Sequence, residues 1–121
     1  MQNSCGTVLI VDDAEPIQIM TRRTLERAGY AVLLASNGEE AIRLLRANSV
    51  DLVLLDMRMP VMDGEEFLAV RARDDTLRRI PVLVHSSEPN PPVRLGEVSG
   101  HVLKPAQDDE LLGCVARAVR G

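Results

Sequence analysis

Five polar side chains that directly follow or end short apolar runs have the types needed for chemistry at phosphorus. Asp12 and Asp13 follow the first apolar run, Asp56 ends a later one, and Ser86 and Lys104 follow two further runs. Clustered carboxylates raise one another's pKa unless they share a cation. Mg2+ suits them, because it takes one or two carboxylates, backbone oxygen and water, and completes its octahedron with phosphate oxygens. The residue types therefore indicate a magnesium-assisted reaction at phosphorus.

Asp56 is the candidate nucleophile of this group. A carboxylate oxygen can attack phosphorus to give an acyl phosphate, and such transfer depends mainly on positioning and charge neutralisation. Lys104, the only lysine of the chain, offers a compact positive charge to the phosphoryl oxygens, and Ser86 offers a hydroxyl. Taken alone, each residue has an ordinary explanation as a solvated strand end, a loop cap or a charged residue before a turn. Their joint position at four strand ends favours one shared site.

Apolar runs that read as strands alternate with amphipathic stretches that read as helices. Strands are expected over 7–11, 30–35, 51–56, 81–85 and 101–103, and helices over 15–28, from 36 onward, over about 65–73 and from about 108. Pro16 and Gly29 are typical of the start and end of the first helix. Its face formed by Ile17, Met20, Thr24 and Ala28 is expected to be the packed one.

The second helix is expected to open with a capping box between Ser36 and Glu39. A different pattern holds from Glu88 to Pro92, where three prolines cannot lie inside a helix. The helix after the fourth strand is therefore predicted to be shortened or disordered. Within the last helix, the inward-facing residues are expected to be Leu111, Leu112, Val115, Ala118 and Val119.

Strands joined by helix-length crossovers predict an α/β fold with a parallel sheet and helices on both faces. Five strands favour the flavodoxin-like doubly wound sheet, order 2-1-3-4-5, over a barrel. In such sheets ligands bind beyond the carboxyl ends of the strands, where the five polar residues are expected. No linker or repeat divides the sequence, so residues 1–121 are predicted to form one domain.

Composition limits the partners of this chain. It has 121 residues with a formal net charge of -4, and no basic stripe favours direct binding of nucleic acid. No apolar stretch is long enough to span a membrane, and the polar start lacks the apolar core of a signal peptide. A cytoplasmic location is therefore expected.

The sequence resembles the receiver domains of bacterial two-component response regulators over essentially its whole length. The matching segments are Val8 to Asp13, Asp51 to Gly64, Pro81 to Ser86, and Lys104-Pro105. The stretch from Asp56 to Gly64 is the most specific of them. The resemblance implies a domain activated by phosphorylation, with a sensor histidine kinase or phosphotransfer protein as donor and a downstream protein target or output domain as partner. Homodimer formation is a further possibility.

The resemblance also implies roles at single positions. Asp13 would ligate Mg2+ directly, Asp12 would assist largely through water, and the backbone carbonyl of Arg58 would add a ligand beside Asp56. Asp56 would accept the phosphate from a phosphohistidine. Lys104 and Ser86 would contact that phosphate, and Ser86 would move toward it on activation. The domain would catalyse its own phosphorylation and dephosphorylation but turn over no external substrate.

Three further positions are expected to tune or report the switch. Arg58 and Glu88 would pair across the pocket and slow loss of the phosphate, although two independently solvated charges remain the alternative. His101 stands where the family often has an inward-turning aromatic residue, and its protonation could couple the switch to pH. Ala106 replaces the aromatic residue that commonly follows Lys-Pro. The mode of output therefore stays open.

Other functions remain as alternatives. A small Mg2+-dependent phosphatase would need a second acid two residues after the nucleophile, where Arg58 stands. A flavin-binding module would offer hydroxyl-rich turns where the first strand here ends in acids. A receiver-like interaction domain that acts without phosphorylation is the closest competitor. The sequence does not separate a stand-alone protein from part of a longer one.

Overall fold

The computed structural model describes residues 5–91, 93 and 97–120. The five strands are β1 (Thr7–Val11), β2 (Ala31–Ala35), β3 (Leu52–Leu55), β4 (Val82–Ser86) and β5 (Gly100–Leu103). The helices are α1 (Glu15–Arg27), α2 (Gly38–Ala47), α3 (Gly64–Ala72) and α4 (Asp108–Arg120), with a 3-10 turn at Leu77–Arg79. The expected elements are confirmed, and their bounds differ from the expected ones by at most two residues.

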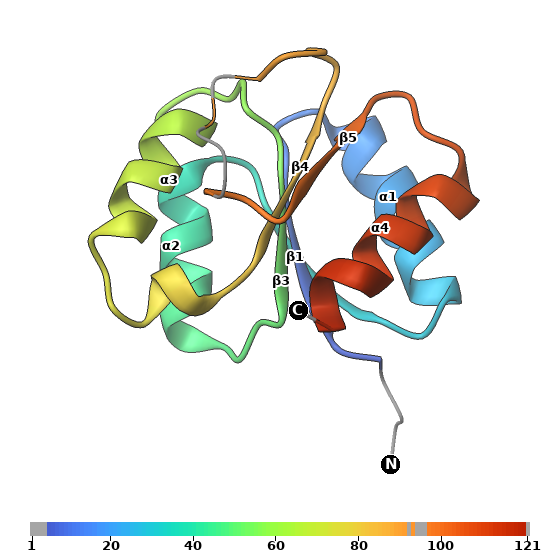
Figure 1. Ribbon diagram of the computed structural model, residues 1–121, viewed down its shortest axis with the longest axis horizontal. Helices are drawn as coiled ribbons and strands as arrows, with labels where there is room; N and C mark the ends of the chain where they lie inside the picture. The colour runs from blue at the N-terminus through green and yellow to red at the C-terminus, as the bar shows by residue number, and fades with distance from the viewer. Residues whose placement is uncertain (1–4, 92, 94–96, 121) are drawn as a thin grey trace.

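All strands are parallel, and their order is β2-β1-β3-β4-β5. Figure 1 shows α2 and α3 on one side of the sheet and α1 and α4 on the other. Both faces are buried, and each has its own apolar core cluster. This explains why the strands read as continuous apolar runs rather than as alternating ones. The predicted doubly wound fold is confirmed.

The packed face of α1 differs from the expected one. Gln18, Thr21 and Leu25 are buried, whereas Met20 is 67% exposed. Apolar spacing alone identified a stripe that begins one residue too early, because it left out a glutamine that the structure buries. The buried face of α4, with Leu111, Val115 and Ala118, agrees with the expected pattern.

The capping box at the start of α2 was assigned one residue too early. Asn37 is the N-cap, and its side chain accepts a hydrogen bond from the Glu40 amide at 2.8 Å. The Glu40 carboxylate accepts from the Ser36 amide at 2.6 Å. Ser36 and Asn37 both have a glutamate three residues later, so spacing alone could not choose between them.

A capping box does open α3, between Asp63 and Glu66. The tight approach of the preceding loop explains Gly64, since a Cβ atom there would lie 2.7 Å from Met57 Cα. The Gly64 amide also donates to the Met57 carbonyl at 3.0 Å. These contacts hold the segment after β3 against the start of α3, next to Asp56.

The connection between β4 and β5 includes residues 92 and 94–96, which lie outside the described residues. The expected shortening or disorder of a helix there falls mainly on these positions and stays a prediction. The described residues between β4 and β5 contain no helix. Buried Arg71 of α3 holds part of this connection, because its guanidinium donates to the carbonyls of Ile80 and Glu97. Among the described helices, none combines the length and apolar character needed to span a bilayer.

Candidate functional site

The three candidate acids lie together at the carboxyl edge of the sheet. Val11 and Leu55 are register partners at the ends of β1 and β3, so Asp12 and Asp56 emerge side by side. The Asp56 amide donates to the Val11 carbonyl at 2.9 Å. One carboxylate oxygen of each of Asp12, Asp13 and Asp56 lies within 4.8 Å of the others. Asp12 is buried, Asp56 is partly buried and Asp13 is exposed, so the cluster opens toward solvent.

Lys104 approaches the same cluster from the end of β5. Its Nζ donates to Asp12 Oδ2 at 2.5 Å and lies 3.7 Å from Asp56 Oδ1. All three side chains are at most 13% exposed, so this is a largely buried ion network. Three carboxylates and one ammonium leave a charge of -2 in the cluster when all are ionised. A divalent cation would match that charge, and oxygen ligands suit Mg2+.

The Asp56 carboxyl has a raised pKa. Burial is the main cause, the Lys104 charge opposes it, and the Asp12 carboxylate adds to it. Weaker backbone contributions from Arg58 and Met57 lower the pKa. Without a metal ion, the surroundings of Asp56 therefore disfavour its ionised form. A bound cation would favour the ionised form, which can act as a nucleophile.

Ser86 completes the floor of the site at the end of β4. Its side chain is buried, and its hydroxyl oxygen accepts from the Glu88 amide at 3.1 Å. Its own carbonyl accepts from the Lys104 amide at 2.8 Å, which joins the ends of β4 and β5. The hydroxyl hydrogen remains able to donate to an oxygen in the pocket.

Arg58 and Glu88 form the ion pair that was expected from the sequence. Arg58 donates to Glu88 Oε2 at 2.7 Å, between the loop after β3 and the loop after β4. The hydrogen bond is the first cause both of the raised pKa of Arg58 and of the lowered pKa of Glu88. Arg58 is 78% exposed, so the pair lies at the mouth of the site rather than inside it.

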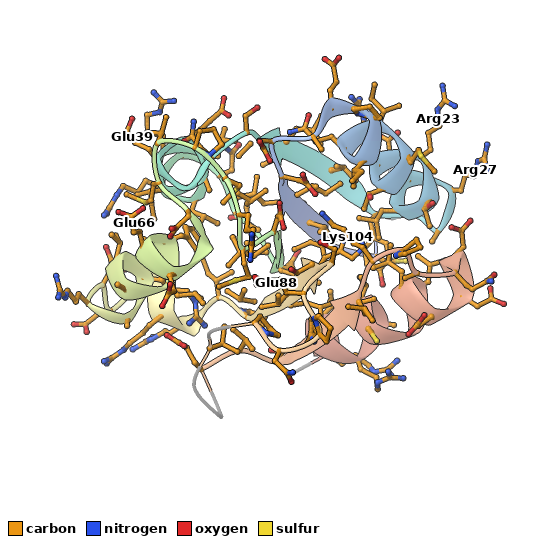
Figure 2. The ribbon with its side chains drawn as sticks, turned by 90° about the horizontal axis from the view of Figure 1, so that it is seen from above. Arg23, Arg27, Glu39, Glu66, Glu88 and Lys104 are labelled. Carbon is orange, nitrogen blue, oxygen red and sulfur yellow. The ribbon has the colours of Figure 1, made fainter. Side chains whose placement is uncertain are left out.

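A pocket of about 390 Å3 lies among these residues, and most of them line it, although Asp13 and Glu88 do not. Figure 2 looks onto this edge of the sheet, with Lys104 and Glu88 near its middle and charged residues of the helices pointing outward around it. The pocket is lined by Asp12, Ala14, Ile17, Asp56, Arg58, Ser86, Ser87, Lys104 and Pro105. It can hold a small anionic group between a nucleophilic carboxylate, an ammonium and a hydroxyl.

His101 is not part of this pocket. It lies on β5, where its Nε2 is buried and has no hydrogen-bond partner among the described residues. It lines a separate groove with Cys114 and Arg117 of α4. Its expected role as a switch residue stays a prediction, as does that of the Arg58 carbonyl as a metal ligand.

Two buried polar residues near the site were missed. Gln18 of α1 donates to the backbone carbonyl of Asp12. His85 of β4 lies close enough to Lys104 and Asp12 for their charges to shift its pKa. Each occupies a position in an apolar pattern, which is the signal that could have identified it. Burial of a polar side chain requires a partner or a neutral form.

Comparison with known proteins assigns the family. The family model for the response regulator receiver domain matches residues 8–116. The chain is 36% identical to the response regulator UvrY of Escherichia coli O6:H1, over 94% of this chain and 54% of UvrY. It is 32% identical to the CAI-1 autoinducer sensor kinase/phosphatase CqsS of Vibrio cholerae, over 90% of this chain and 17% of that protein. The chain thus spans only part of the length of these relatives.

Solved structures show the same fold. The chemotaxis response regulator CheY4 of Vibrio cholerae superposes with a TM-score of 0.83 and 31% identity, covering 93% of this chain and 98% of that one. The receiver domain of the sensor histidine kinase PA1611 from Pseudomonas aeruginosa gives a TM-score of 0.86 at 24% identity, covering 96% and 98%. That structure holds a magnesium ion in its active site cleft. The strand order, the cluster of acids at the carboxyl edge of the sheet and the family match all lead to one conclusion. The chain belongs to the response regulator receiver domain family.

Proposed function

We propose that this chain is one receiver domain whose phosphorylation on Asp56 switches its binding to a protein partner. The donor would be a phosphohistidine of a sensor histidine kinase or phosphotransfer protein. The observation that carries the proposal is the approach of Asp12, Asp13 and Asp56 within 4.8 Å, with the Lys104 ammonium between two of them. Family membership and the sensor-kinase relatives support it.

Asp12, Asp13 and Asp56 would hold Mg2+, which neutralises charge on the carboxylates and on the incoming phosphoryl oxygens. Asp56 is partly buried at the end of a strand and lines the pocket, so a carboxylate oxygen can face an incoming phosphoryl group. That oxygen attacks phosphorus, the P–N bond of the phosphohistidine breaks, and the histidine leaves with the bonding electrons. An acyl phosphate forms on Asp56.

Lys104 and Ser86 would contact the phosphoryl group once it is bound to Asp56. Asp12 holds Lys104 in the unphosphorylated state, and a phosphoryl group on Asp56 offers its ammonium a second, more highly charged acceptor. Ser86 can turn its hydroxyl toward the same oxygens. Lys104 and Ser86 are joined through their backbones, so their displacement would reach β4 and β5 together. Those strands would carry the signal to the partner-binding surface.

The test is intact-mass analysis after incubation with acetyl phosphate, with and without Mg2+. A gain of one phosphoryl group that needs Mg2+ and is labile in alkali would support the proposal. Asp56→Asn is the matched control, because it keeps the shape of the side chain and removes both the nucleophile and a partly buried charge. A folded protein that gains no phosphoryl group would favour a receiver-like interaction domain acting without phosphate.

A further inference from the structure

Gln18 is a buried amide on the face of α1 that packs against the sheet. It is 8% exposed and shares this face with Thr21 and Leu25. A buried amide is costly unless it is hydrogen-bonded, so its partners indicate its role. It lies beneath the turn that carries the acid pair and does not line the pocket itself.

The Gln18 side chain joins the ends of two strands. Its Nε2 donates to the carbonyl of Asp12 and, at 3.2 Å, to the carbonyl of Ala35. The Ala35 carbonyl also accepts from the Asp12 amide at 3.0 Å. Ala35 ends β2 and Asp12 directly follows β1, so both residues lie where the two strands begin to separate. Gln18 therefore holds the strand ends together just past the last pair of β1 and β2.

The Asp12 carbonyl belongs to the peptide bond between the two acids. Rotation of that peptide plane changes where both the Asp12 and Asp13 side chains point. Two further hydrogen bonds restrain the Asp12 side chain: the Ala14 amide donates to Asp12 Oδ1 at 2.9 Å, and Lys104 Nζ donates to Asp12 Oδ2. Ala14 is the N-cap of α1 and supplies no side-chain cap. The Gln18 amide is thus the side-chain link from α1 to the peptide that aims the acids.

We propose that Gln18 is a positioning residue that fixes the Asp12–Asp13 peptide and thereby sets the affinity of the acid cluster for a divalent cation. The inference rests on the proposed function, since it concerns the same metal site. Groups that orient metal ligands typically change metal affinity by about 10- to 100-fold when they are removed. A residue that only filled space would change stability and leave metal affinity alone.

The test compares Gln18→Met with Thr21→Val in the full chain. Methionine keeps the unbranched shape and removes both donors, whereas Thr21→Val alters the same buried face without touching the turn. Mg2+ titrations followed by calorimetry, with thermal unfolding of the metal-free proteins alongside, separate affinity from stability. Gln18→Met is expected to bind Mg2+ at least about 10-fold more weakly. Thr21→Val is expected to bind within two-fold of the unchanged protein.

A second measurement covers the case in which Gln18→Met does not fold. Gln18→Asn keeps an amide that is one methylene too short to reach both carbonyls, and it is expected to show the same weaker Mg2+ binding. For a folded variant, the Mg2+ concentration for half-maximal phosphorylation should rise while the rate at saturating Mg2+ changes little. Mg2+ binding within two-fold of that of the unchanged protein, in folded Gln18→Met or Gln18→Asn, would overturn this inference and leave the proposed function intact. Failure of the unchanged protein to bind Mg2+ would overturn the proposed function as well.

Discussion

Acidification is expected to destabilise the domain through His85. This histidine is 7% exposed on β4, and its pKa is lowered to about 4. Burial is the main cause, the Lys104 charge adds to it, Asp12 opposes it, and His101 adds a smaller effect. The unfolded chain takes up the proton near the ordinary value of about 6.5. The free energy of unfolding is therefore insensitive to His85 above about pH 6.5 and falls as the pH drops from there toward 4.

The size of the effect follows from the two pKa values. Their difference is about 2.5 units, and each unit corresponds to about 1.4 kcal/mol, so the full loss approaches about 3 kcal/mol. At pH 5.5, one pH unit below the ordinary pKa of histidine, the loss is about 1 kcal/mol. Asp56, whose raised pKa favours proton uptake by the folded state, acts in the opposite direction. The effect must therefore be read as a difference between variants.

Urea unfolding between pH 7.5 and pH 4.5 provides the assay, with His85→Leu compared with the unchanged protein. Leucine is similar to histidine in size and cannot take up a proton. The stability advantage of His85→Leu should grow steadily as the pH falls below 6.5. His101→Gln controls for loss of a histidine as such. Parallel pH profiles for His85→Leu and the parent would refute the argument.

Three other features can be tested by substitution: the Arg58–Glu88 ion pair, the backbone at Val61 and the cap of α3. Arg58→Ala and Glu88→Ala should each speed the loss of phosphate from the phosphorylated protein several-fold, and the double variant should lose it little faster than either single variant. A dephosphorylation time course measures these rates. Additive effects, or no effect, would show that the ion pair does not act as a unit. Val61 has a φ of 66° and is 72% exposed, so Val61→Asn should raise the free energy of unfolding by about 1 kcal/mol, and an unchanged urea midpoint would contradict the assigned strain. Asp63→Ala removes the α3 capping box and should lower the free energy of unfolding by about 1 kcal/mol. Glu65 lies in the same turn and has no capping role, so Glu65→Ala should not lower it in this way.

The sequence predicted those parts of the site that depend on strand ends. In a parallel sheet the carboxyl ends of all strands lie at one edge, so Asp12, Asp56, Ser86 and Lys104 had to meet once their strands were recognised. The pairing of Arg58 with Glu88 also follows from strand order, because β3 and β4 are neighbours.

What the sequence did not predict depends on helix rotation and on partners far along the chain. The Gln18 amide reaches the carbonyl of Ala35, seventeen residues away, and no local pattern encodes that contact. The choice between Ser36 and Asn37 as a cap depends on where β2 ends rather than on spacing. His85 reads as the end of an apolar strand, and only the packing of α1 and α4 over that face shows that it is buried.

The site combines two groups of residues that are held in different ways. Asp12, Asp56, Lys104 and Ser86 are largely buried and lie at strand ends. Replacing Asp12, Asp56 or Lys104 disturbs the ion network, and replacing Ser86 removes the acceptor of the Glu88 amide. Arg58 and Glu88 are held mainly by each other at the exposed mouth, where an ion pair adds little to stability. Substitutions at that pair should therefore change the lifetime of the phosphorylated state while leaving the fold and metal affinity nearly unchanged. Under the proposed function, the duration of the phosphorylated state could therefore be altered independently of the ability to accept phosphate.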